Sequence, residues 1–252
     1  MDRLDAQAIA LPGVEVAVVE RCTSTNSILL KQPIHGPSLL AAEEQTAGRG
    51  RRGRRWHSAP GAGATFSLAA RLRRPMREMP ALSLVAGVAA SRALRRMGVA
   101  DAALKWPNDL VVRGAKLGGI LVETRADGGA CHAVIGIGIN CRRDPALAGR
   151  LRREVSFLED FVAVSRNRLI REVAASLLEA LRRFEAGGLD ALRGEWEAMD
   201  AHAGQRLRVR LADGRVVTGV ASGLAQNGAL QILTSRGMRA VTSGRVVSAR
   251  AA

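Results

Sequence analysis

The 252-residue sequence contains no tyrosine, four phenylalanines and three tryptophans, so aromatic residues make up only 3% of the chain. Stacking on bases is therefore a poor basis for an interaction with single-stranded nucleic acid. No run of about 18 apolar residues occurs, and residues 1–13, which include Asp2 and Asp5, lack the apolar stretch of a signal peptide. These absences predict a cytoplasmic protein that neither spans a membrane nor is secreted.

Residues that commonly bind transition metals are also few. The three cysteines are an odd number without C-x-x-C spacing, and we interpret them as free thiols in a reducing compartment rather than as disulfides or a zinc site. The four histidines are scattered and form no recognisable set of ligands. The residues concerned are Cys22, Cys131, Cys141, His35, His57, His132 and His202.

Several standard catalytic signatures are missing as well. The sequence has no G-x-x-x-x-G-K-[ST], no G-x-G-x-x-G that opens a helix after a strand, and no H-E-x-x-H. No Ser/His/Asp or Cys/His arrangement can be read from it. Acyl transfer through a side-chain nucleophile therefore has no support.

Lysine is scarce in a chain whose formal net charge is +15. Only Lys31, Lys105 and Lys116 are lysines among 38 basic residues. Such a preference for arginine is as typical of a genome-wide codon bias as of a surface selected for binding. In this background, a lysine indicates a position where a compact ammonium group is required.

Hydrophobic periodicity and turn residues divide most of the chain into alternating strands and helices. Helices are predicted from the N-cap cluster at residues 23–26, over 82–97 before Gly98, over 166–185 and over 189–199. Between residues 141 and 155 the chain is rich in arginine and poor in apolar residues, and we expect a mobile surface loop there. Strands are predicted at 14–20, 39–43, 65–71, 103–106, 110–112, 116–124 and 131–140.

The pattern changes near Gly204, where short strands follow one another with turns between them. Eight arginines and a single acidic residue, Asp213, follow this point, so the C-terminal segment is strongly basic. Five strands in fewer than 50 residues predict a small β-barrel of SH3-like size. We therefore divide the chain into domains at residues 1–202 and 203–252. The strands are predicted at 207–211, 216–224, 229–233, 238–242 and 245–249.

The richest motif is Q-T-A-G-R-G-R-R-G-R-R-W at residues 45–56, with five arginines and three glycines between Gly48 and Arg55. Glycine permits backbone conformations that let consecutive N–H groups turn toward one ligand. Guanidinium groups suit carboxylate and phosphate. The segment therefore predicts an anion-binding loop; a solvated basic turn or a nucleic-acid-binding tail is the alternative.

Two further segments fit the same chemistry. In K-W-P-N-D at residues 105–109, a lysine can face phosphate and Asp109 can hold Mg²⁺, although an ordinary turn with a solvated aspartate has the same sequence. Paired glycines interrupt the apolar strands K-L-G-G-I-L-V-E-T, from Lys116, and V-I-G-I-G-I-N, which ends at Asn140. Glycine inside a strand removes side chains where a ligand or another backbone comes close.

Taken in order, these segments resemble one family, the biotin–protein ligases. The similarity rests on T-S-T-N at 23–26, the Arg/Gly motif at 45–56, K-W-P-N-D at 105–109, K-L-G-G-I-L-V-E at 116–123 and G-I-G-I-N at 136–140. It extends from about Val14 into the C-terminal barrel. Five motifs with matching order and spacing are far more specific than any one of them.

The resemblance implies an α+β fold. Its catalytic domain would be a mixed β-sheet with flanking helices, akin to class II aminoacyl-tRNA synthetases and lipoate ligases, followed by the SH3-like barrel. It also implies a two-step reaction that uses biotin, ATP and Mg²⁺. Biotin is first converted to biotinyl-5′-AMP and is then transferred to a lysine of the biotin carboxyl carrier protein of acetyl-CoA carboxylase.

The same resemblance assigns roles to individual residues. The implied biotin-binding residues are Ser24, Thr25, Asn26, Gln45, Gly48, Arg49, Gly50, Arg51 and Lys116. Those implied for ATP are Arg54, Arg55, Trp56, Lys105, Asn108, Asp109 and Asn140. Arg51, Lys105 and Lys116 are the implied catalytic residues, and Asp109 is the implied ligand of Mg²⁺.

The sequence departs from some family members in two places. Only about 20 residues precede the T-S-T-N segment, too few for an N-terminal helix-turn-helix, so a monofunctional ligase without a DNA partner is expected. Some members also have a tryptophan after the G-I-N segment that stacks on adenine, whereas this chain offers Val155 or Phe157.

Two alternative functions stay open at this point. A lipoate or octanoate ligase of the same superfamily shares the sheet and the acyl-adenylate chemistry, but its substrate requires an apolar ring pocket in place of Ser24, Thr25 and Gln45. A basic nucleic-acid-binding protein without enzymatic activity is the second alternative. The sequence does not distinguish a monomer from a homodimer.

Overall fold

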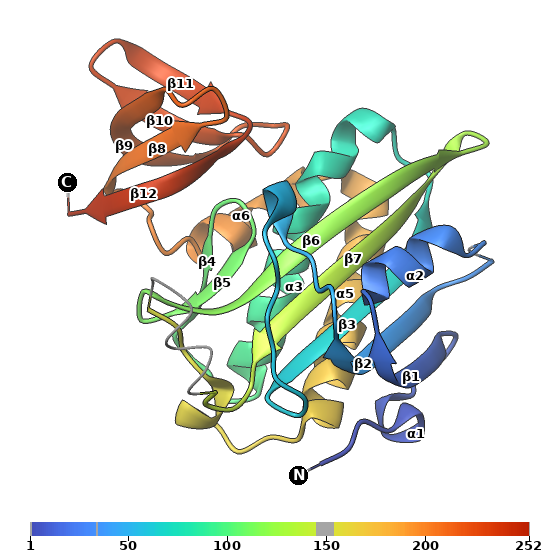
Figure 1. Ribbon diagram of the computed structural model, residues 1–252. Coiled ribbons are helices and arrows are strands. Elements are labelled where there is room, and N and C mark those ends of the chain that lie inside the picture. Colours follow the sequence, from blue (N-terminus) through green and yellow to red (C-terminus); the bar gives the residue numbers. More distant parts are fainter. Residues whose placement is uncertain (1, 34, 145–153, 252) are drawn as a thin grey trace.

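A computed structural model describes residues 2–33, 35–144 and 154–251 of the chain and contains two β-sheets (Figure 1). The larger sheet has seven strands in the order β1-β2-β3-β7-β6-β5-β4. Its β1 and β2 are parallel and its other neighbouring strands are antiparallel, which confirms the predicted mixed sheet. The strands are β1 (Glu15–Cys22), β2 (Ser38–Gln45), β3 (Gly63–Leu72), β4 (Ala102–Lys105), β5 (Asp109–Val112), β6 (Ala115–Asp127) and β7 (Ala130–Asn140).

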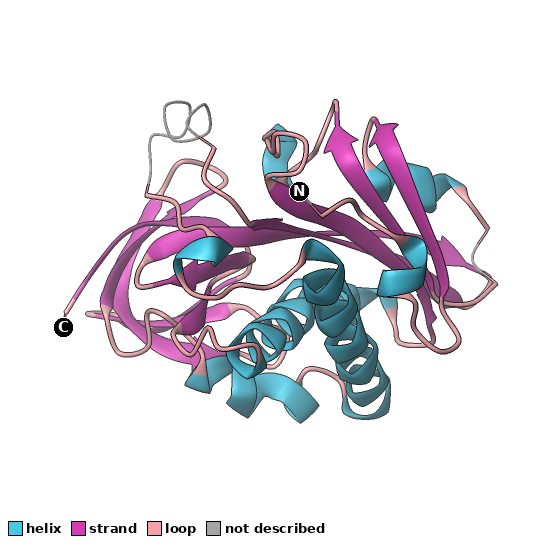
Figure 2. Cartoon of the chain, turned by 90° about the horizontal axis from the view of Figure 1, so that it is seen from below, coloured by secondary structure: helices cyan, strands magenta, loops and turns pink. Residues whose placement is uncertain are grey.

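The two long helices, α3 (Leu82–Arg96) and α5 (Arg166–Gly187), pack together on one face of this sheet, and α6 (Asp190–Ala198) contacts both of them (Figures 1 and 2). The shorter α2 (Thr25–Lys31) covers part of the opposite face, where it contacts β3 and β7. Covered on both faces, β3 and β7 are almost completely buried. This explains why both read as nearly continuous apolar runs.

The remaining helical elements are short. The α1 helix (Ala6–Ile9) is capped by the side chain of Asp5 and packs against α5. Three 3₁₀ turns occur at Arg51–Gly53 (η1), Met76–Ala81 (η2) and Leu158–Asp160 (η3). The first of these lies within the predicted anion-binding loop and shapes the site described below.

The smaller sheet has five antiparallel strands in the order β11-β10-β9-β8-β12 and matches the predicted C-terminal barrel. Aspartate, asparagine or arginine followed by a positive-φ glycine forms its turns at Gly214, Gly228 and Gly237. The strands are β8 (Arg206–Leu211), β9 (Val216–Leu224), β10 (Leu230–Thr234), β11 (Gly237–Val241) and β12 (Gly244–Arg250).

Contacts between the two sheets fix the barrel beside the K-W-P-N-D segment. The Leu104 N–H donates to Met199 O, and the Ala201 N–H donates to Leu104 O, both at 2.8 Å, so the linker is hydrogen-bonded to β4. The buried Trp106 indole donates to Gly228 O of the barrel at 3.2 Å. Buried apolar side chains of both sheets belong to one continuous cluster. The barrel therefore lies against the larger sheet rather than on a separate tether.

The structure also bears on the predictions about membrane helices, cysteines and the loop at residues 141–155. Within the described residues, no helix has the length and apolar character needed to cross a membrane. Cys22, Cys131 and Cys141 are free cysteines, as predicted. The loop expected between residues 141 and 155 falls mostly on residues 145–153, which lie outside the described residues.

Candidate active site

A cavity of about 390 Å³ lies between the Arg/Gly loop, the strand face that α2 partly covers, and the hairpin of β4 and β5. It brings together motifs that are far apart in the sequence, as the predicted anion site requires. Of the predicted site residues, those that line it are Ser24, Thr25, Asn26, Gln45, Arg49, Gly50, Arg51, Arg54, Arg55, Trp56, Lys105, Asn108, Asp109 and Lys116.

Hydroxyl and amide groups form one end of the cavity. Gln45 Oε1 accepts hydrogen bonds from the Thr25 N–H at 2.8 Å and from Thr25 Oγ1 at 3.2 Å. Thr25 Oγ1 also lies 2.6 Å from Ser67 Oγ, which donates to Asn26 Oδ1 at 2.6 Å. Ser24 is the N-cap residue of α2 but makes no side-chain capping bond. A connected polar network therefore holds this end in a defined shape.

The amide of Asn26 is held from a second direction by β6. Its Nδ2 donates to Leu121 O at 3.2 Å and to Glu123 Oε2 at 3.1 Å. On the neighbouring strand, a Cβ atom added to Gly136 would overlap the Asn26 side chain. Glycine is therefore required at Gly136 for this amide to lie against the sheet.

The Arg/Gly loop closes on itself above the sheet. The Trp56 N–H donates to Gly48 O at 3.0 Å, and the Gly50 N–H donates to Arg54 O at 2.7 Å. Between these bonds Arg52 has a φ of 56°, a left-handed conformation that is uncommon for a residue with a side chain. Its guanidinium donates to Ser243 Oγ of the barrel at 2.7 Å. The loop is thus braced by its own backbone and by the C-terminal sheet.

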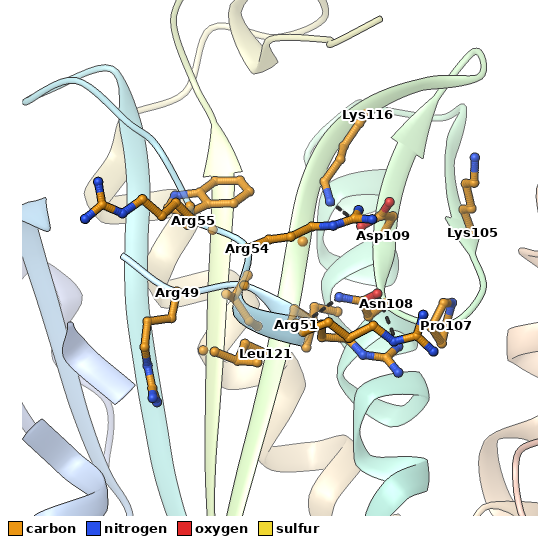
Figure 3. A pocket seen from close by; sticks show the side chains of 18 of the residues that line it. Arg49, Arg51, Arg54, Arg55, Lys105, Pro107, Asn108, Asp109, Lys116 and Leu121 are labelled. Atoms are coloured by element: carbon orange, nitrogen blue, oxygen red, sulfur yellow. Dashed lines mark hydrogen bonds and ion pairs between the residues drawn. The ribbon is translucent and has the colours of Figure 1, made fainter. Parts of the chain in front are cut away.

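The arginines of the loop point in different directions (Figure 3). Arg51 and Arg54 extend toward Asn108 and Asp109, whereas Arg49 forms an ion pair with Glu123 on the other side. Arg51 Nη1 donates to Asn108 Oδ1 at 3.4 Å. Burial lowers the pKa of the Arg51 guanidinium below its ordinary value, and the Arg52 charge acts in the same direction. A partly desolvated cation of this kind acts strongly on a bound anion.

Lys116, a predicted catalytic residue, contacts Asp109, the predicted ligand of Mg²⁺. The Lys116 ammonium on β6 forms an ion pair with the Asp109 carboxylate on β5, and their side chains are only 13% and 23% exposed. Asn108, which precedes Asp109, is hydrogen-bonded to β6 in two places. Its Nδ2 donates to Ile120 O at 2.7 Å, and the Ile120 N–H donates to Asn108 O at 3.0 Å. Lys105 lies at the far side of the cluster, at the end of β4 (Figure 3).

Gly48 and Asn140 are among the predicted site residues but do not line the cavity. Gly48 has a structural position, since a Cβ atom there would lie 2.6 Å from Trp56 O. Asn140 is buried, and its Nδ2 donates to the backbone carbonyls of Lys116 and Ser156, both at 3.4 Å. In this structure both residues support their neighbours rather than facing the cavity.

Neither candidate for covering an adenine lines the cavity. Val155 pairs with Lys116 through its backbone, and Phe157 is buried with the Arg143 guanidinium 5.9 Å from its ring centre. Trp56, by contrast, lies on the bare backbone of Gly138, and its buried indole N–H has no partner among the described residues. Trp56 therefore gives the cavity an aromatic side chain, while its indole N–H is buried near Gly138.

Some cavity residues lay outside the sequence-based set. Thr65 lines the cavity, and Ser67, two residues further along β3, belongs to the polar network. Polar residues with a period of two inside an apolar strand were the available signal, because alternate residues share one face. The barrel also contributes Gly244, Arg245, Val246 and Val247. No local pattern marks that contribution, since it depends on how the two sheets pack.

Carboxylates are few in this site. Asp109 and Glu154 are the acidic residues that line the cavity in the described part of the chain. Among the same residues, no group of three or more His, Cys, Asp and Glu side chains could enclose a metal ion. The site is therefore predominantly cationic, which suits an anionic ligand that carries its own divalent ion.

Comparison with known proteins points in the same direction as this geometry. The biotin/lipoate A/B protein ligase family model matches residues 18–140, and the biotin protein ligase C terminal domain model matches residues 202–247. The bifunctional ligase/repressor BirA of Escherichia coli is 34% identical over 96% of this chain and 76% of its own length. The biotin–[acetyl-CoA-carboxylase] ligase of Mycobacterium tuberculosis is 32% identical over 94% of this chain and 90% of its own length.

A solved structure extends the similarity to three dimensions. The biotin protein ligase from Aquifex aeolicus, in complex with biotin and ATP, superposes with a TM-score of 0.78. Its sequence is 28% identical, and the match covers 94% of this chain and 99% of that chain. Both sheets therefore have counterparts in one known protein.

Proposed function

The chain belongs to the biotin protein ligase family, and we propose that it attaches biotin to a lysine of the biotin carboxyl carrier protein of acetyl-CoA carboxylase. Like the related ligases, it is an ATP-dependent enzyme that acts on biotin. One observation carries the proposal. A single cavity joins a pocket of fixed hydroxyl and amide groups to a cluster of lysine and arginine side chains.

The polar end of the cavity is suited to the ureido ring of biotin. That ring presents N–H donors and a carbonyl acceptor, and the side chains of Ser24, Thr25 and Gln45 offer groups of both kinds. The hydrogen bonds among Thr25, Ser67 and Asn26 fix these groups before the ligand arrives. A lipoate dithiolane would leave such buried polar groups without partners, which is costly. The geometry therefore favours biotin over lipoate or octanoate.

The first step joins two anions, and the cationic side of the cavity lowers that barrier. A carboxylate oxygen of biotin attacks the α-phosphorus of ATP, the bond to the β-phosphate breaks, and pyrophosphate leaves. Arg51 and Arg54 extend toward the region where the phosphates would lie, with Lys105 at its edge. Cations held in place before reaction stabilise the charge that grows on the phosphoryl oxygens. Arg51, Lys105 and Lys116 are the residues to which we assign catalytic roles.

To Lys116 we assign the binding of the biotin carboxylate. In the ligand-free chain its ammonium is held by Asp109, so the charge is already in position on a rigid strand. An incoming carboxylate competes with Asp109 for that ammonium. The binding roles assigned to Gly50, to the arginines of the loop and to Asn108 are part of the same proposal. For Gly48 and Asn140 we propose an indirect role, through the neighbouring residues that they support.

Mg²⁺ fits this site as an ion that accompanies ATP. Mg²⁺ commonly uses one or two protein carboxylates together with substrate phosphates, and Asp109 supplies one such carboxylate. When bound, the ion would neutralise charge on the phosphates. Asp109 would then hold the ion while Lys116 holds biotin.

In the second step the ε-amine of the acceptor lysine attacks the acyl carbon of biotinyl-AMP. A C–N bond forms, the bond to the phosphate oxygen breaks, and AMP leaves. Since AMP is already a good leaving group, no enzyme nucleophile is required, in accordance with the absence of a Ser/His/Asp motif. We also expect the reaction to take place in the cytoplasm. The boundary between the two domains, at residues 202 and 203, stays a prediction.

The experiment is exchange of labelled pyrophosphate into ATP, measured with biotin, lipoate or octanoate as the acid. Biotin should support exchange, and the other two acids should give about 10⁴-fold less, which is the discrimination expected when buried polar groups lose their partners. Mass spectrometry of the carrier domain should then show one biotinylated lysine. Equal exchange with lipoate would assign the chain to the other branch of the superfamily, and no exchange with any acid would refute the proposal.

A further inference from the structure

The outer face of β8 carries three arginines that nothing in the described chain neutralises. Arg206, Arg208 and Arg210 are exposed and alternate with the buried Leu207 and Val209, so their side chains share one face of the strand. β12 adds Arg245 and Arg250, which lie opposite Arg210 and Arg206 in the strand register. We call these five residues the arginine stripe.

Abundant arginine in the sequence does not by itself explain the stripe. Several arginines elsewhere form ion pairs with acids, as Arg166 does with Glu43 and Arg183 with Glu195. Within the described residues, none of the five stripe arginines has an ion pair with a carboxylate. Like charges directly opposite each other destabilise a strand pair. The fold therefore tolerates a repulsion that an acidic partner would relieve.

The stripe begins at the mouth of the catalytic cavity. Arg245 belongs to the stripe and also lines the cavity, together with Val247 on the same strand. Ser243, just before β12, accepts a hydrogen bond from Arg52 of the Arg/Gly loop at 2.7 Å. A molecule bound along β8 and β12 would therefore lie next to the place where the acyl group is activated (Figure 1).

We infer that the arginine stripe is the docking surface for an acidic face of the protein that supplies the acceptor lysine. The inference rests on the proposed function, because the second step requires a macromolecule to bring a lysine amine to the cavity mouth. Exposed Val216, 40% accessible, and Val247, 37% accessible, adjoin the arginines and provide the apolar contacts typical of a protein interface.

Two other occupants fit this face less well. A second copy of the chain would bring the same five positive charges against this face, and like charges across an interface are unfavourable. Residues 204–252 contain no phenylalanine, tyrosine or tryptophan, so the barrel has no side chain on which single-stranded nucleic acid could stack. Double-stranded DNA is kept as an outcome of the test.

The test variant reverses the three charges that lie away from the cavity, Arg206→Glu, Arg208→Glu and Arg210→Glu. A matched control makes the same change at Arg182 on α5 and at Arg236 and Arg239 near the opposite edge of the small sheet, all exposed. Both triple variants have the same net charge, so a difference between them reports position rather than total charge. Circular dichroism and thermal unfolding establish that each is folded.

Three activities are measured for each protein: pyrophosphate exchange with biotin, trapping of biotinyl-AMP by hydroxylamine, and transfer to a purified biotin carboxyl carrier domain. In the stripe variant the first two should stay within about twofold of wild type, because they need no docking. The KM for the carrier domain should rise at least about tenfold at low salt, since electrostatic steering contributes about 10- to 1000-fold to association. The control variant should keep a KM near that of wild type.

Ionic strength and direct binding complete the test. Wild-type transfer should weaken as NaCl rises from about 0.05 to about 0.5 M, whereas the stripe variant should lose this dependence. Fluorescence anisotropy with labelled carrier domain measures docking without catalysis, so a chain that failed to activate biotin would refute the proposed function but not this surface. Unchanged carrier binding in the stripe variant, equal losses in both variants, or a selective loss of affinity for a DNA duplex would overturn the inference.

Discussion

At the scale of single residues, the side chain of Asn26 depends on the absence of one at Gly136. A Cβ atom at Gly136 would overlap the Asn26 amide, which also accepts from Ser67 Oγ at 2.6 Å. We predict that Gly136→Ala displaces Asn26 and leaves polar groups of the ring pocket without partners. The affinity for biotin should fall by about 1.5–3 kcal/mol, roughly ten- to a hundredfold. Isothermal titration calorimetry with biotin, and separately with ATP, measures this.

The helical glycine Gly194 provides the control for that substitution. Nothing lies within 4 Å of a Cβ atom added there, so Gly194→Ala should leave biotin affinity unchanged and should stabilise α6 by about 0.5–1 kcal/mol. ATP affinity should also stay near wild type in Gly136→Ala, because the polar end lies away from the nucleotide. If Gly136→Ala binds biotin normally, Asn26 does not shape the ring pocket.

At Lys116, we expect activity to depend on the residue being lysine and not only on its positive charge. A carboxylate nucleophile must be bound while one oxygen stays free to attack phosphorus. A point-like ammonium permits this, whereas a planar guanidinium tends to engage both oxygens. Lys116→Arg should therefore adenylate biotin far more slowly than wild type despite its conserved charge. Lys116→Ala should weaken biotin binding by about 1.5–3 kcal/mol.

Calorimetry and adenylate formation are measured in parallel for both Lys116 variants. Asp109→Asn provides a further comparison, because it removes the partner of Lys116 in the ligand-free chain but leaves the ammonium in place. That variant should retain biotin binding while its dependence on Mg²⁺ changes. A Lys116→Arg enzyme with wild-type rates would show that Lys116 does not hold the biotin carboxylate.

The sequence motifs predicted most of the residues that meet in the cavity, but not the direction of every side chain. The Arg/Gly loop, the K-W-P-N-D segment and Lys116 do meet in one cavity. Asn140 was predicted to face the nucleotide, but its amide reaches the backbone of Lys116 and Ser156 instead. Alternation along a strand indicates only two directions, and at the last residue of β7 the following chain decides between them. Such orientations depend on packing that a motif does not encode.

At the scale of elements, the linker between the two sheets contains two titratable groups with opposite behaviour. Burial raises the pKa of Asp200 to about 6, and burial together with the Lys105 charge lowers the pKa of His202 to about 4. The His202 N–H donates to Asp200 Oδ1 at 3.0 Å. The linker is thus most stable when both side chains are uncharged.

The sign of each effect follows from proton binding. Between its ordinary pKa of about 3.9 and about 6, Asp200 binds more protons in the folded state, so its contribution to stability falls as pH rises. Between about 4 and its ordinary pKa of about 6.5, His202 binds more protons in the unfolded state, so its contribution falls as pH drops. Over about pH 4–6 the two slopes oppose each other.

Single substitutions should separate the opposing pH dependences that Asp200 and His202 give to the folding stability. Asp200→Asn should be more stable than wild type at pH 7 by on the order of 1–2 kcal/mol, and this advantage should vanish as pH falls below about 4. His202→Gln should match wild type at pH 7 and gain relative stability as pH falls from about 6.5 toward 4. Denaturant titrations across this range provide the measurement. Parallel pH profiles for all three proteins would contradict the assignment.

The elements themselves were largely predictable. The predicted 216–224 strand coincides with β9, and the helix predicted over 82–97 is α3, which ends before the positive-φ Gly98. These segments have strong periodicity and clear turn residues. The four-residue α1 was not predicted, because one turn has too few residues to show a period and is stabilised by its packing on α5. Local pattern thus fails where tertiary contact creates the element.

At the scale of the whole molecule, the barrel and the larger sheet share a core. Buried side chains of β8 and β9, such as Leu207 and Val217, belong to the same apolar cluster as Leu104 and Trp106. Sequence alone predicted two domains but not this continuity, because the residues that meet are about 100 positions apart. A shared core favours a single cooperative unfolding transition over two separate ones.

Trp106 joins the two parts, and its indole N–H offers the sharpest test of that coupling. Trp106→Phe keeps most of the apolar contact but removes the donor to Gly228 O, which should cost about 1–3 kcal/mol because a buried carbonyl loses its partner. Because the two sheets share one core, hydrogen exchange in β9 and β10 should accelerate as much as exchange in β3 and β7. A selective acceleration in β9 and β10 would show that the barrel opens independently. Phe184→Leu, a change in the fully buried ring of α5, is the matched control and should reduce protection in both sheets together. Equal loss in both sheets for Trp106→Phe would mean that the barrel unfolds only with the whole molecule. In that case the contact between Arg52 and Ser243 would persist whenever the larger sheet is folded, and the barrel would be a fixed wall of the cavity rather than a part that opens independently.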